Sequence, residues 1–394
     1  MRKQTIRDID LQGKRVFLRV DYNVQFVNGR ILDDHRLRES IPTIWALQGA
    51  GARIIICSHR GRPGGEVVEE LRNSPVAEHL STLLEQQVRS VPVCVGPEAQ
   101  AAVDALEPGE IVVLENVRFH AEEESNDPDF ARALADLADV YVSDAFGTAH
   151  RAHASVVGVP TYLPGVAGLL MEREVDYLSR IIDAPERPLG LILGGAKVTE
   201  KLAILEHLCD QADVICVGGG IANTFLMAQG IDVGASLAEP ERIEDAFAVM
   251  RKAAKRPDLK LVLPRDVVIS DSAGETVDAV SVNLIPPDFR ILDVGPDTVE
   301  DFRAALAPMR TIAWNGPMGL FEREPFDRGS LEVARLLADL DDATTVVGGG
   351  ETAAAVARAG VTDRISHCST GGGASLQLLE GRVLPGLEAL IDAD

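Results

Sequence analysis

LILGGAK (residues 191–197) decides how the second half of this chain folds, because an apolar run stops there in two glycines. The same ending recurs in ICVGGG (215–220), TVVGGG (345–350) and CSTGGG (368–373). A glycine turn after a strand exposes backbone N–H groups, and it usually opens a helix whose N-terminal dipole favours an anion. One such cluster is equally typical of an ordinary turn. Four of them predict a phosphate-binding wall.

Short runs rich in Val and Ile alternate with amphipathic stretches along the whole chain. The other predicted strands are RVFLRV (15–20), RIIICS (53–58), VPVCV (91–95), IVVLENV (111–117), VYVSDAF (140–146), KLVLPRDVVI (260–269) and TIAWNGP (311–317). Because parallel strands need crossovers, this alternation predicts parallel sheets with helices on both faces. The predicted fold class is α/β, with two Rossmann-like domains that each hold a mainly parallel sheet flanked by helices.

Helices are predicted over 37–48, 74–87 and 127–138. The third has the clearest start, with Asp127 as its N-cap and a proline at the first helical position. LLMEREVDYLSRII (169–182) has apolar pairs on one face of a helix, which predicts a connector helix and hinge between the domains. An ordinary surface helix within one domain would show the same periodicity.

Composition narrows the classes of protein to consider. A length of 394 residues indicates about two to three domains. The net charge of −23 argues against nucleic acid or an anionic membrane surface as a partner, so an anionic substrate would need a local basic site. The five cysteines are scattered and show no CxxC spacing, which is typical of buried, reduced thiols. No apolar run approaches a membrane span, and the predicted location is the cytoplasm.

Arginines distinguish the first half. They are Arg36 in DDHRLRES, Arg62 in SHRGRPGG, Arg118 in ENVRFHAEEES and Arg151 in FGTAHRAHAS. All but the first closely follow a predicted strand, where ligands usually bind a parallel sheet, and the arginine fork suits phosphate or carboxylate. Each alone is more typical of a solvated surface side chain. Asp21 and Asn23 also end a strand, either as acceptors for a substrate hydroxyl or as turn caps.

Two lysines, Lys197 and Lys201, stand four residues apart in GGAKVTEK, on one face of a helix if one begins after the glycines. Neither a Walker A loop nor a GxGxxG fingerprint is present in the second half. GGGET (348–352) places Glu351 at a predicted helix start, where it is either a Mg²⁺ ligand beside phosphates or a favourable first-turn acid. Glu322 meets ribose hydroxyls or is solvated.

At this point the sequence resembles the phosphoglycerate kinase family over nearly its full length. The motifs that carry the resemblance occur in the family's order: VDYNV, SHRGRP, ENVRFH, DAFGTAHRAHAS, LGGAKVTEK, WNGPMGLFE, GGGET and STGGGAS. The resemblance implies a phosphotransferase with a carboxyl group as acceptor. Its reaction would be the reversible, Mg²⁺-dependent transfer of a phosphoryl group between 1,3-bisphosphoglycerate and ADP, giving 3-phosphoglycerate and ATP, by in-line transfer with domain closure.

The resemblance also implies a division of the chain. Residues 1–168 would form the phosphoglycerate-binding domain, 169–188 the connector helix and hinge, and 189–375 the nucleotide-binding domain. Residues 376–394 would return to the N-terminal domain. A monomer that binds only small molecules is expected, with magnesium arriving as Mg-ADP or Mg-ATP.

Site residues follow from the same motifs. The implied substrate-binding residues are Asp21, Asn23, Arg36, His59, Arg60, Gly61, Arg62, Arg118 and Arg151. The implied nucleotide-binding residues are Lys197, Lys201, Gly218, Gly219, Gly220, Asn315, Glu322, Gly349, Gly350, Glu351 and Thr352, with the metal at Glu351. The implied catalytic residues are Arg36, Lys197, Gly371, Gly372 and Gly373.

Three positions depart from the commonest family pattern. Tyr22 replaces Phe or Leu, and Arg60 stands where an apolar residue is frequent. Glu351 replaces the usual Asp, which leaves open whether Mg²⁺ is held directly or through water. Two other classes of function also stay open: a dehydrogenase with two α/β domains, which the missing GxGxxG disfavours, and a catalytically silent family member that serves as a scaffold.

Overall fold

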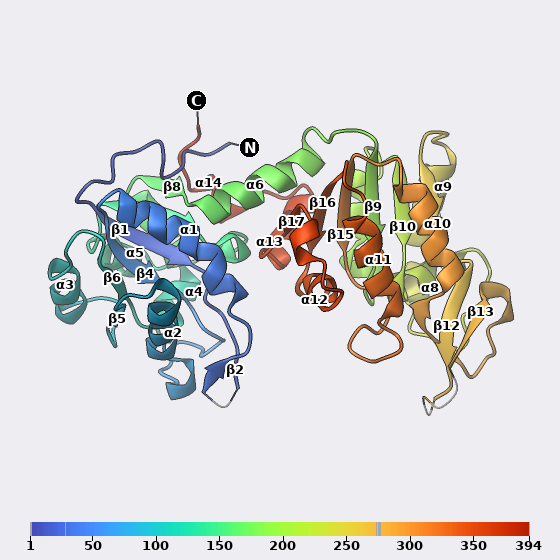
Figure 1. Cartoon of the computed structure of the whole chain (residues 1–394), viewed down its shortest axis with the longest axis horizontal. Helices are drawn as coiled ribbons and strands as arrows, with labels where there is room; N and C mark the ends of the chain where they lie inside the picture. Colours follow the sequence, from blue (N-terminus) through green and yellow to red (C-terminus); the bar gives the residue numbers. More distant parts are fainter. Residues whose placement is uncertain (1, 28, 273, 275–276, 394) are drawn as a thin grey trace. The chain divides into compact units, whose positions relative to one another are not determined.

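The computed structural model describes residues 2–27, 29–272, 274 and 277–393, which form two compact units (Figure 1). Unit 1 comprises Met1–Asp176 and Val383–Asp394, and unit 2 comprises Tyr177–Arg382. Helix α6 (Leu169–Ile182) carries the chain from one unit into the other. The boundary therefore falls within the connector helix, and the segment that rejoins unit 1 starts at residue 383.

Unit 1 is built on a parallel sheet with the strand order β5-β6-β4-β1-β7-β8. These strands are β1 (Arg15–Val20), β4 (Arg53–Cys57), β5 (Arg89–Ser90), β6 (Ile111–Val113), β7 (Val140–Asp144) and β8 (Gly165–Ala167). The helices of the unit are α1 (His35–Gly49), α2 (Ser74–Leu84), α3 (Pro97–Asp104), α4 (Ala121–Ser125), α5 (Pro128–Ala135) and α14 (Pro385–Glu388), and β2 (Phe26–Val27) pairs with β3 (Arg30–Ile31). The strand predicted over 91–95 is wrong, because β5 covers Arg89–Ser90, and beyond it Val91 N donates to Val113 O at 3.0 Å without a regular strand.

Unit 2 has its own parallel sheet, with the order β11-β10-β9-β15-β16-β17. These strands are β9 (Leu189–Leu193), β10 (Val214–Val217), β11 (Lys260–Val262), β15 (Thr311–Asn315), β16 (Thr344–Gly348) and β17 (His367–Cys368). Its helices are α7 (Leu202–Leu208), α8 (Gly219–Ala228), α9 (Ile243–Ala254), α10 (Pro296–Leu306), α11 (Arg328–Ala338), α12 (Gly350–Arg358) and α13 (Gly373–Leu379). The predicted α/β class with two mainly parallel sheets is confirmed.

Unit 2 also contains a small antiparallel sheet that the sequence analysis did not predict. This sheet has the order β13-β12-β14, from β12 (Asp266–Ser270), β13 (Val277–Ser281) and β14 (Arg290–Val294). The single strand predicted over 260–269 is wrong, because β11 ends at Val262 and β12 belongs to this second sheet. Pro264 lies between them and cannot continue a ladder.

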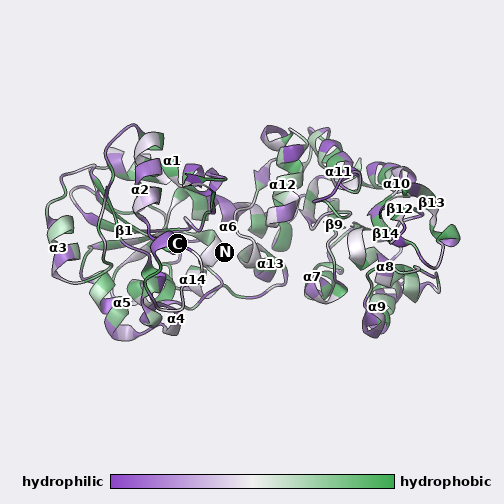
Figure 2. Ribbon diagram, turned by 90° about the horizontal axis from the view of Figure 1, so that it is seen from below, coloured by the Kyte–Doolittle hydropathy of each residue, from purple (hydrophilic) through white to green (hydrophobic). Residues whose placement is uncertain are grey.

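The cores lie between each parallel sheet and its helices. In unit 1 the middle strands are almost fully buried, and Phe17, Leu18 and Ile55 have no exposed surface. In unit 2 Trp314 of β15 is 1% exposed, and its indole N–H donates to Gly316 O at 2.8 Å. Helices in both units carry hydrophobic and hydrophilic residues together (Figure 2), as amphipathic covers of a sheet do. No helix in the described part of the chain combines the length and apolar character of a membrane span.

The start predicted for the third helix is confirmed. Asp127 Oδ1 accepts hydrogen bonds from Asp129 N at 3.0 Å and Phe130 N at 2.9 Å, which satisfies two of the free N–H groups at the start of α5. We expect Asp127→Ala to lower the free energy of unfolding by about 1 kcal/mol. Chemical denaturation of the two proteins measures this loss. Asp129→Ala, on the same turn but without a capping bond, is the control, and an equal loss there would contradict the assignment.

Candidate functional site

The first group of predicted residues meets at the carboxyl ends of strands in unit 1. Asp21 follows β1, His59 follows β4, and Arg36 lies in the first turn of α1. Arg36 Nη1 donates to Asp21 Oδ2 at 2.5 Å, and His59 Nδ1 lies 4.0 Å from Asp21 Oδ1. The side chains of Arg36 and His59, which come from different elements, therefore both lie beside the Asp21 carboxylate.

A second set of contacts joins the neighbouring loops to this group. Gly61 N donates to Asn23 Oδ1 at 2.8 Å, and Arg118 Nη1 donates to Gly61 O at 2.8 Å. Arg118 belongs to the 3₁₀ turn η2 (Val117–Phe119), which follows β6, and is 3% exposed. The SHRGRP and ENVRFH motifs are thus held together at one edge of the sheet.

The electrostatics of this group are those of positive side chains beside the Asp21 carboxylate. Burial raises the pKa of the Asp21 carboxyl, but neighbouring positive charge, including that of Arg36 and Arg19, outweighs it, so that pKa lies below its ordinary value. Burial also lowers the pKa of Arg118, and the charge of Arg151 lowers it further. Positively charged side chains that lie close together in this way favour the binding of an anion.

Two predicted residues of SHRGRP differ from their neighbours. Arg62 is exposed. Arg60 is 3% exposed, its Nη1 donates to Arg72 O, and its guanidinium lies 4.2 Å from the centre of the Phe26 ring. Contacts of this kind are those of a side chain that supports the loop, so substrate binding by Arg60 stays a prediction.

In unit 2 the four strands that end in glycine lie close together in the sheet. β10 is next to β9, β16 is next to β17, and β15 alone lies between the two pairs. Lys201 Nζ donates to Asn315 Oδ1 at the end of β15, and Asn315 Nδ2 donates to Gly348 O at 2.9 Å. Thr352 Oγ1 accepts from Gly316 N at 2.8 Å. The predicted nucleotide residues Lys201, Asn315 and Thr352 therefore meet at one edge.

The idea that Lys197 and Lys201 share a helix face is wrong. Lys197 is extended, with φ −132° and ψ 135°, a 3₁₀ turn covers Val198–Glu200, and α7 begins only at Leu202. Lys197 is exposed, whereas Lys201 is 6% exposed and burial lowers its pKa. The two ammonium groups are thus presented differently, one free to reach a ligand and one fixed beside Asn315.

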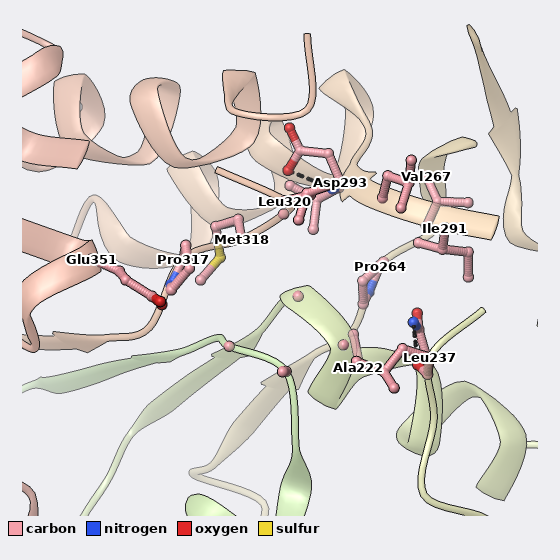
Figure 3. Close-up of a pocket in the computed structure, with 18 of the residues that line it drawn as sticks. Ala222, Leu237, Pro264, Val267, Ile291, Asp293, Pro317, Met318, Leu320 and Glu351 are labelled. Carbon is pink, nitrogen blue, oxygen red and sulfur yellow. Dashed lines mark hydrogen bonds between the residues drawn. The ribbon is translucent and has the colours of Figure 1, made fainter. Parts of the chain in front are cut away.

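A cavity of about 210 Å³ opens beside these residues. Glu351, Pro317 and Met318 lie on one side of it, and Ala222 and Leu237 on the other (Figure 3). The predicted residues Gly219, Gly220, Glu322 and Glu351 line it. An apolar cleft whose wall also includes carboxylates and glycine backbone suits a flat heterocycle that carries polar substituents.

Glycine is required at two positions of the cavity wall. Gly219 has φ +61°, and a Cβ there would lie 2.7 Å from Gly195 O. A Cβ at Gly220 would lie 2.4 Å from Ala196 O. The start of α8 therefore packs against the glycine loop that follows β9, and Gly218 is the N-cap of that helix.

The last predicted helix start is only partly free for an anion. Gly372 is the N-cap of α13, and Gly371 N already donates to Ser369 Oγ at 3.1 Å. At the corresponding start of α12, Gly349 is the N-cap, with φ +96°, and Gly350 is the first helical residue. α12 follows β16 and α13 follows β17, and these two strands are paired in parallel. Both helices therefore start at the same edge of the sheet.

Sequence reasoning missed the apolar lining of the cavity, which comes largely from the antiparallel sheet and its surroundings. These residues include Pro264, Val267, Ile291, Leu292 and Val294. Asp293 lines the same wall, with Oδ2 accepting from Gly329 N at 2.7 Å, and burial raises its pKa to about 8. Nothing in an apolar run marks it as a ligand wall, so no sequence signal pointed here.

The residues present fit a magnesium ion that is brought in by a polyphosphate. Within the residues that the structure describes, no group of three or more His, Cys, Asp or Glu side chains is arranged to hold a metal ion. Glu351 offers one exposed carboxylate on the cavity wall. Magnesium takes oxygen ligands and usually keeps waters, so one carboxylate beside phosphates is a sufficient protein share.

Comparison with known proteins gives the family. The phosphoglycerate kinase family model matches residues 6–382. The chain belongs to the phosphoglycerate kinase family. It is 52% identical to the phosphoglycerate kinase of Pelotomaculum thermopropionicum and 50% identical to that of Moorella thermoacetica, in each case over 100% of both chains.

Solved structures of the family agree with the fold. Phosphoglycerate kinase from Coxiella burnetii has a TM-score of 0.89 and 40% identity, and the enzyme from Pyrococcus horikoshii has 0.86 and 34%. Each match covers 98% of both chains. Phosphoglycerate kinases catalyse phosphoryl transfer between 1,3-bisphosphoglycerate and ADP in glycolysis. The resemblance inferred from the ordered motifs is thus confirmed.

Proposed function

We propose that this chain catalyses the reversible transfer of a phosphoryl group between 1,3-bisphosphoglycerate and ADP, with unit 1 binding the phosphoglycerate and unit 2 the Mg-nucleotide. The observation that carries the proposal is the cationic group around Asp21 in unit 1, in a chain whose net charge is −23. A strongly acidic protein that gathers the cations Arg36 and Arg118 and the ring of His59 at one sheet edge has built a site for a small anion.

The reaction needs no general base. Its nucleophile is an ADP phosphate oxygen in one direction and the phosphoglycerate carboxylate in the other, and both are ionised at neutral pH. Catalysis must then come from positioning and from stabilisation of the charge that spreads over the transferred phosphoryl group.

The side chains divide these tasks. We assign Arg36 to one flank of the transferred group and the exposed Lys197 to the other, while Lys201 and Thr352 orient the nucleotide phosphates. Because Gly371 N is already bonded, the N–H donors near the phosphoryl group would be those of Gly372 and Gly373. The glycines of 218–220 and Glu322 would meet the nucleoside.

The proposal requires the two groups of residues to meet during turnover, since Arg36 belongs to unit 1 and Lys197 to unit 2. Closure would also exclude water, which otherwise hydrolyses an acyl phosphate. When bound with the nucleotide, magnesium supplies further charge neutralisation on the phosphate oxygens. We expect the protein to work as a cytoplasmic monomer on small molecules alone.

A coupled assay for ATP formation from 1,3-bisphosphoglycerate and ADP tests the proposal. Turnover that depends on both substrates and on Mg²⁺ is the expected result. Binding of both ligands without turnover would favour a silent scaffold instead. A change in nicotinamide absorbance with a candidate substrate, in the absence of coupling enzymes, would favour a dehydrogenase.

Replacements at Glu351 test its place at the metal. We expect Glu351→Asp to keep substantial activity, because a carboxylate remains on the cavity wall, and Glu351→Ala to lose about tenfold or more at limiting Mg²⁺. Activity measured against Mg²⁺ concentration separates the two variants. Full activity of the alanine variant at limiting Mg²⁺ would remove Glu351 from the metal site.

A further inference from the structure

A buried arginine that the proposed mechanism does not use lies directly beneath the substrate side of unit 1. Arg19 belongs to β1 and is 1% exposed, although its neighbours in the strand are apolar. Its Nε donates to Ser155 Oγ at 2.8 Å, and its Nη1 donates to Val20 O. Its Nη2 lies 3.4 Å from His59 Nδ1. A guanidinium fixed on three sides has a defined direction toward that histidine.

The serine that accepts from Arg19 is itself held by a fully buried acid. Glu123 of α4 has no exposed surface, and it accepts hydrogen bonds from Ser155 N at 2.8 Å and Ser155 Oγ at 2.6 Å. His153 Nδ1 lies 3.7 Å from the same carboxylate. Burial raises the pKa of Glu123, but His153, Arg19 and Ser155 together keep it below the ordinary value, so the acid is ionised. A continuous set of contacts thus runs from Glu123 through Ser155 and Arg19 to His59.

The contact with Arg19 fixes which nitrogen of His59 carries the proton. Arginine has donors only, so a hydrogen bond between Nη2 and Nδ1 requires Nδ1 to be the acceptor. The competing carboxylate, Asp21, is 4.0 Å from Nδ1, beyond hydrogen-bond distance, and the same oxygen accepts from Asn23 N at 3.2 Å. Nδ1 is therefore unprotonated, and the proton lies on Nε2.

The charges around the ring act in the same sense. Burial lowers the pKa of His59 well below its ordinary value; Asp21 opposes this, while Arg19, Arg118 and Arg151 lower it further. A doubly protonated ring would also direct an N–H at the Arg19 cation. Within the described residues, both polar contacts of the ring are made through Nδ1, which leaves Nε2 for a ligand.

We infer that Arg19 is a positioning residue, which holds His59 as a neutral ring protonated on Nε2 so that Nε2–H is offered to the substrate as a hydrogen-bond donor. This inference rests on the proposed function for the identity of that substrate. The assignment of the proton does not, since it follows from the contact of Arg19 with Nδ1 and from the distance between Nδ1 and Asp21.

Nitrogen NMR of the full chain tests the assignment directly. Two-bond ¹H–¹⁵N correlations distinguish an unprotonated ring nitrogen from a protonated one, and the signal missing from His59→Gln identifies the ring of interest. The expected result is an unprotonated Nδ1 and a protonated Nε2 across neutral pH. A protonated Nδ1 in the unmodified protein would overturn the inference, whatever the activity.

Arg19→Met tests the cause, with Arg15→Met as the matched control. Arg15 lies in the same strand but pairs with Asp139, at 2.8 Å. In Arg19→Met we expect part of the His59 population to protonate on Nδ1, the ring to take up a proton at higher pH, and affinity for 3-phosphoglycerate to fall about tenfold. In Arg15→Met all three should be unchanged.

The remaining outcomes are also decisive. A folded Arg19→Met protein with the original tautomer and affinity would overturn the inference. If that variant does not fold, Arg19→Lys keeps the cation and one group of donors, and we expect it to retain the tautomer. An unmodified protein that shows the expected tautomer but does not bind 3-phosphoglycerate would leave the assignment of the proton standing and overturn the proposed function.

Discussion

Arg36→Ala is expected to lower turnover by about 10³-fold while leaving Mg-ADP affinity within about twofold. Arg36 Nη1 contacts Asp21 at the phosphoglycerate side, and it belongs to unit 1, whereas the nucleotide residues belong to unit 2. In the role that we propose for it, its charge acts on the phosphoryl group during transfer and takes no part in nucleotide binding. Steady-state kinetics together with Mg-ADP titration of the free protein measure the two effects separately.

Arg38→Ala is the matched control for that experiment. Arg38 lies two residues further along α1, pairs with Asp34 at 2.8 Å and has a side chain that is 58% exposed. Surface pairs of this kind contribute little, so we expect almost no change. Arg36→Lys should recover only part of the lost turnover, because an ammonium cannot replace the planar fork. Near-normal turnover of Arg36→Ala would remove this residue from the transferred group.

Lys201→Met is expected to weaken Mg-ADP binding by about 10- to 100-fold and to lower turnover at least as much. Lys201 Nζ donates to Asn315 Oδ1 at the glycine-rich edge of the sheet, where Thr352 Oγ1 also accepts from Gly316 N at 2.8 Å. We infer that the buried ammonium contacts the nucleotide phosphates. Calorimetric titration with Mg-ADP and with adenosine separates phosphate contacts from contacts with the base.

Adenosine affinity decides between a phosphate contact and general damage to unit 2. The adenosine affinity should be unchanged in Lys201→Met, because adenosine has no phosphate that Lys201 could contact. Lys255→Met, at an exposed lysine after α9, is the control. Equal losses for adenosine and Mg-ADP would mean that the substitution disturbs the cavity itself, since Asn315 Oδ1 would be left without its donor.

The sequence was a good guide to the parallel sheets. RVFLRV coincides with β1, and each of the four glycine clusters follows a strand, because apolar runs that are buried on both faces have few alternatives. It was a poor guide where tertiary contacts choose between similar local structures. The run 260–269 looks like one strand, yet it is divided between two sheets.

The candidate site residues also divide into those that the sequence indicated and those that only the tertiary structure revealed. Ordered motifs were enough to name Asp21, Arg36, His59 and Lys201 and the family that carries them. They gave no access to the apolar wall of the cavity, since its residues come from β12 and β14 and are marked by no motif. The motifs also did not predict that Lys197 and Lys201 lie on different local structures. The 3₁₀ turn between these lysines depends on packing rather than on their spacing in the sequence.

The sequence by itself determined the α/β class, the parallel strands that end in glycine, and the chemistry of the side chains placed there. Those features are local, since they depend on apolar periodicity, on glycine conformations and on which residue types bind phosphate. Tertiary structure alone decided that Arg19 in an apolar strand reaches His59 and that Ser155 connects it with Glu123. Residues 136 positions apart meet there only because the sheet folds them together, and a buried charge needs such partners.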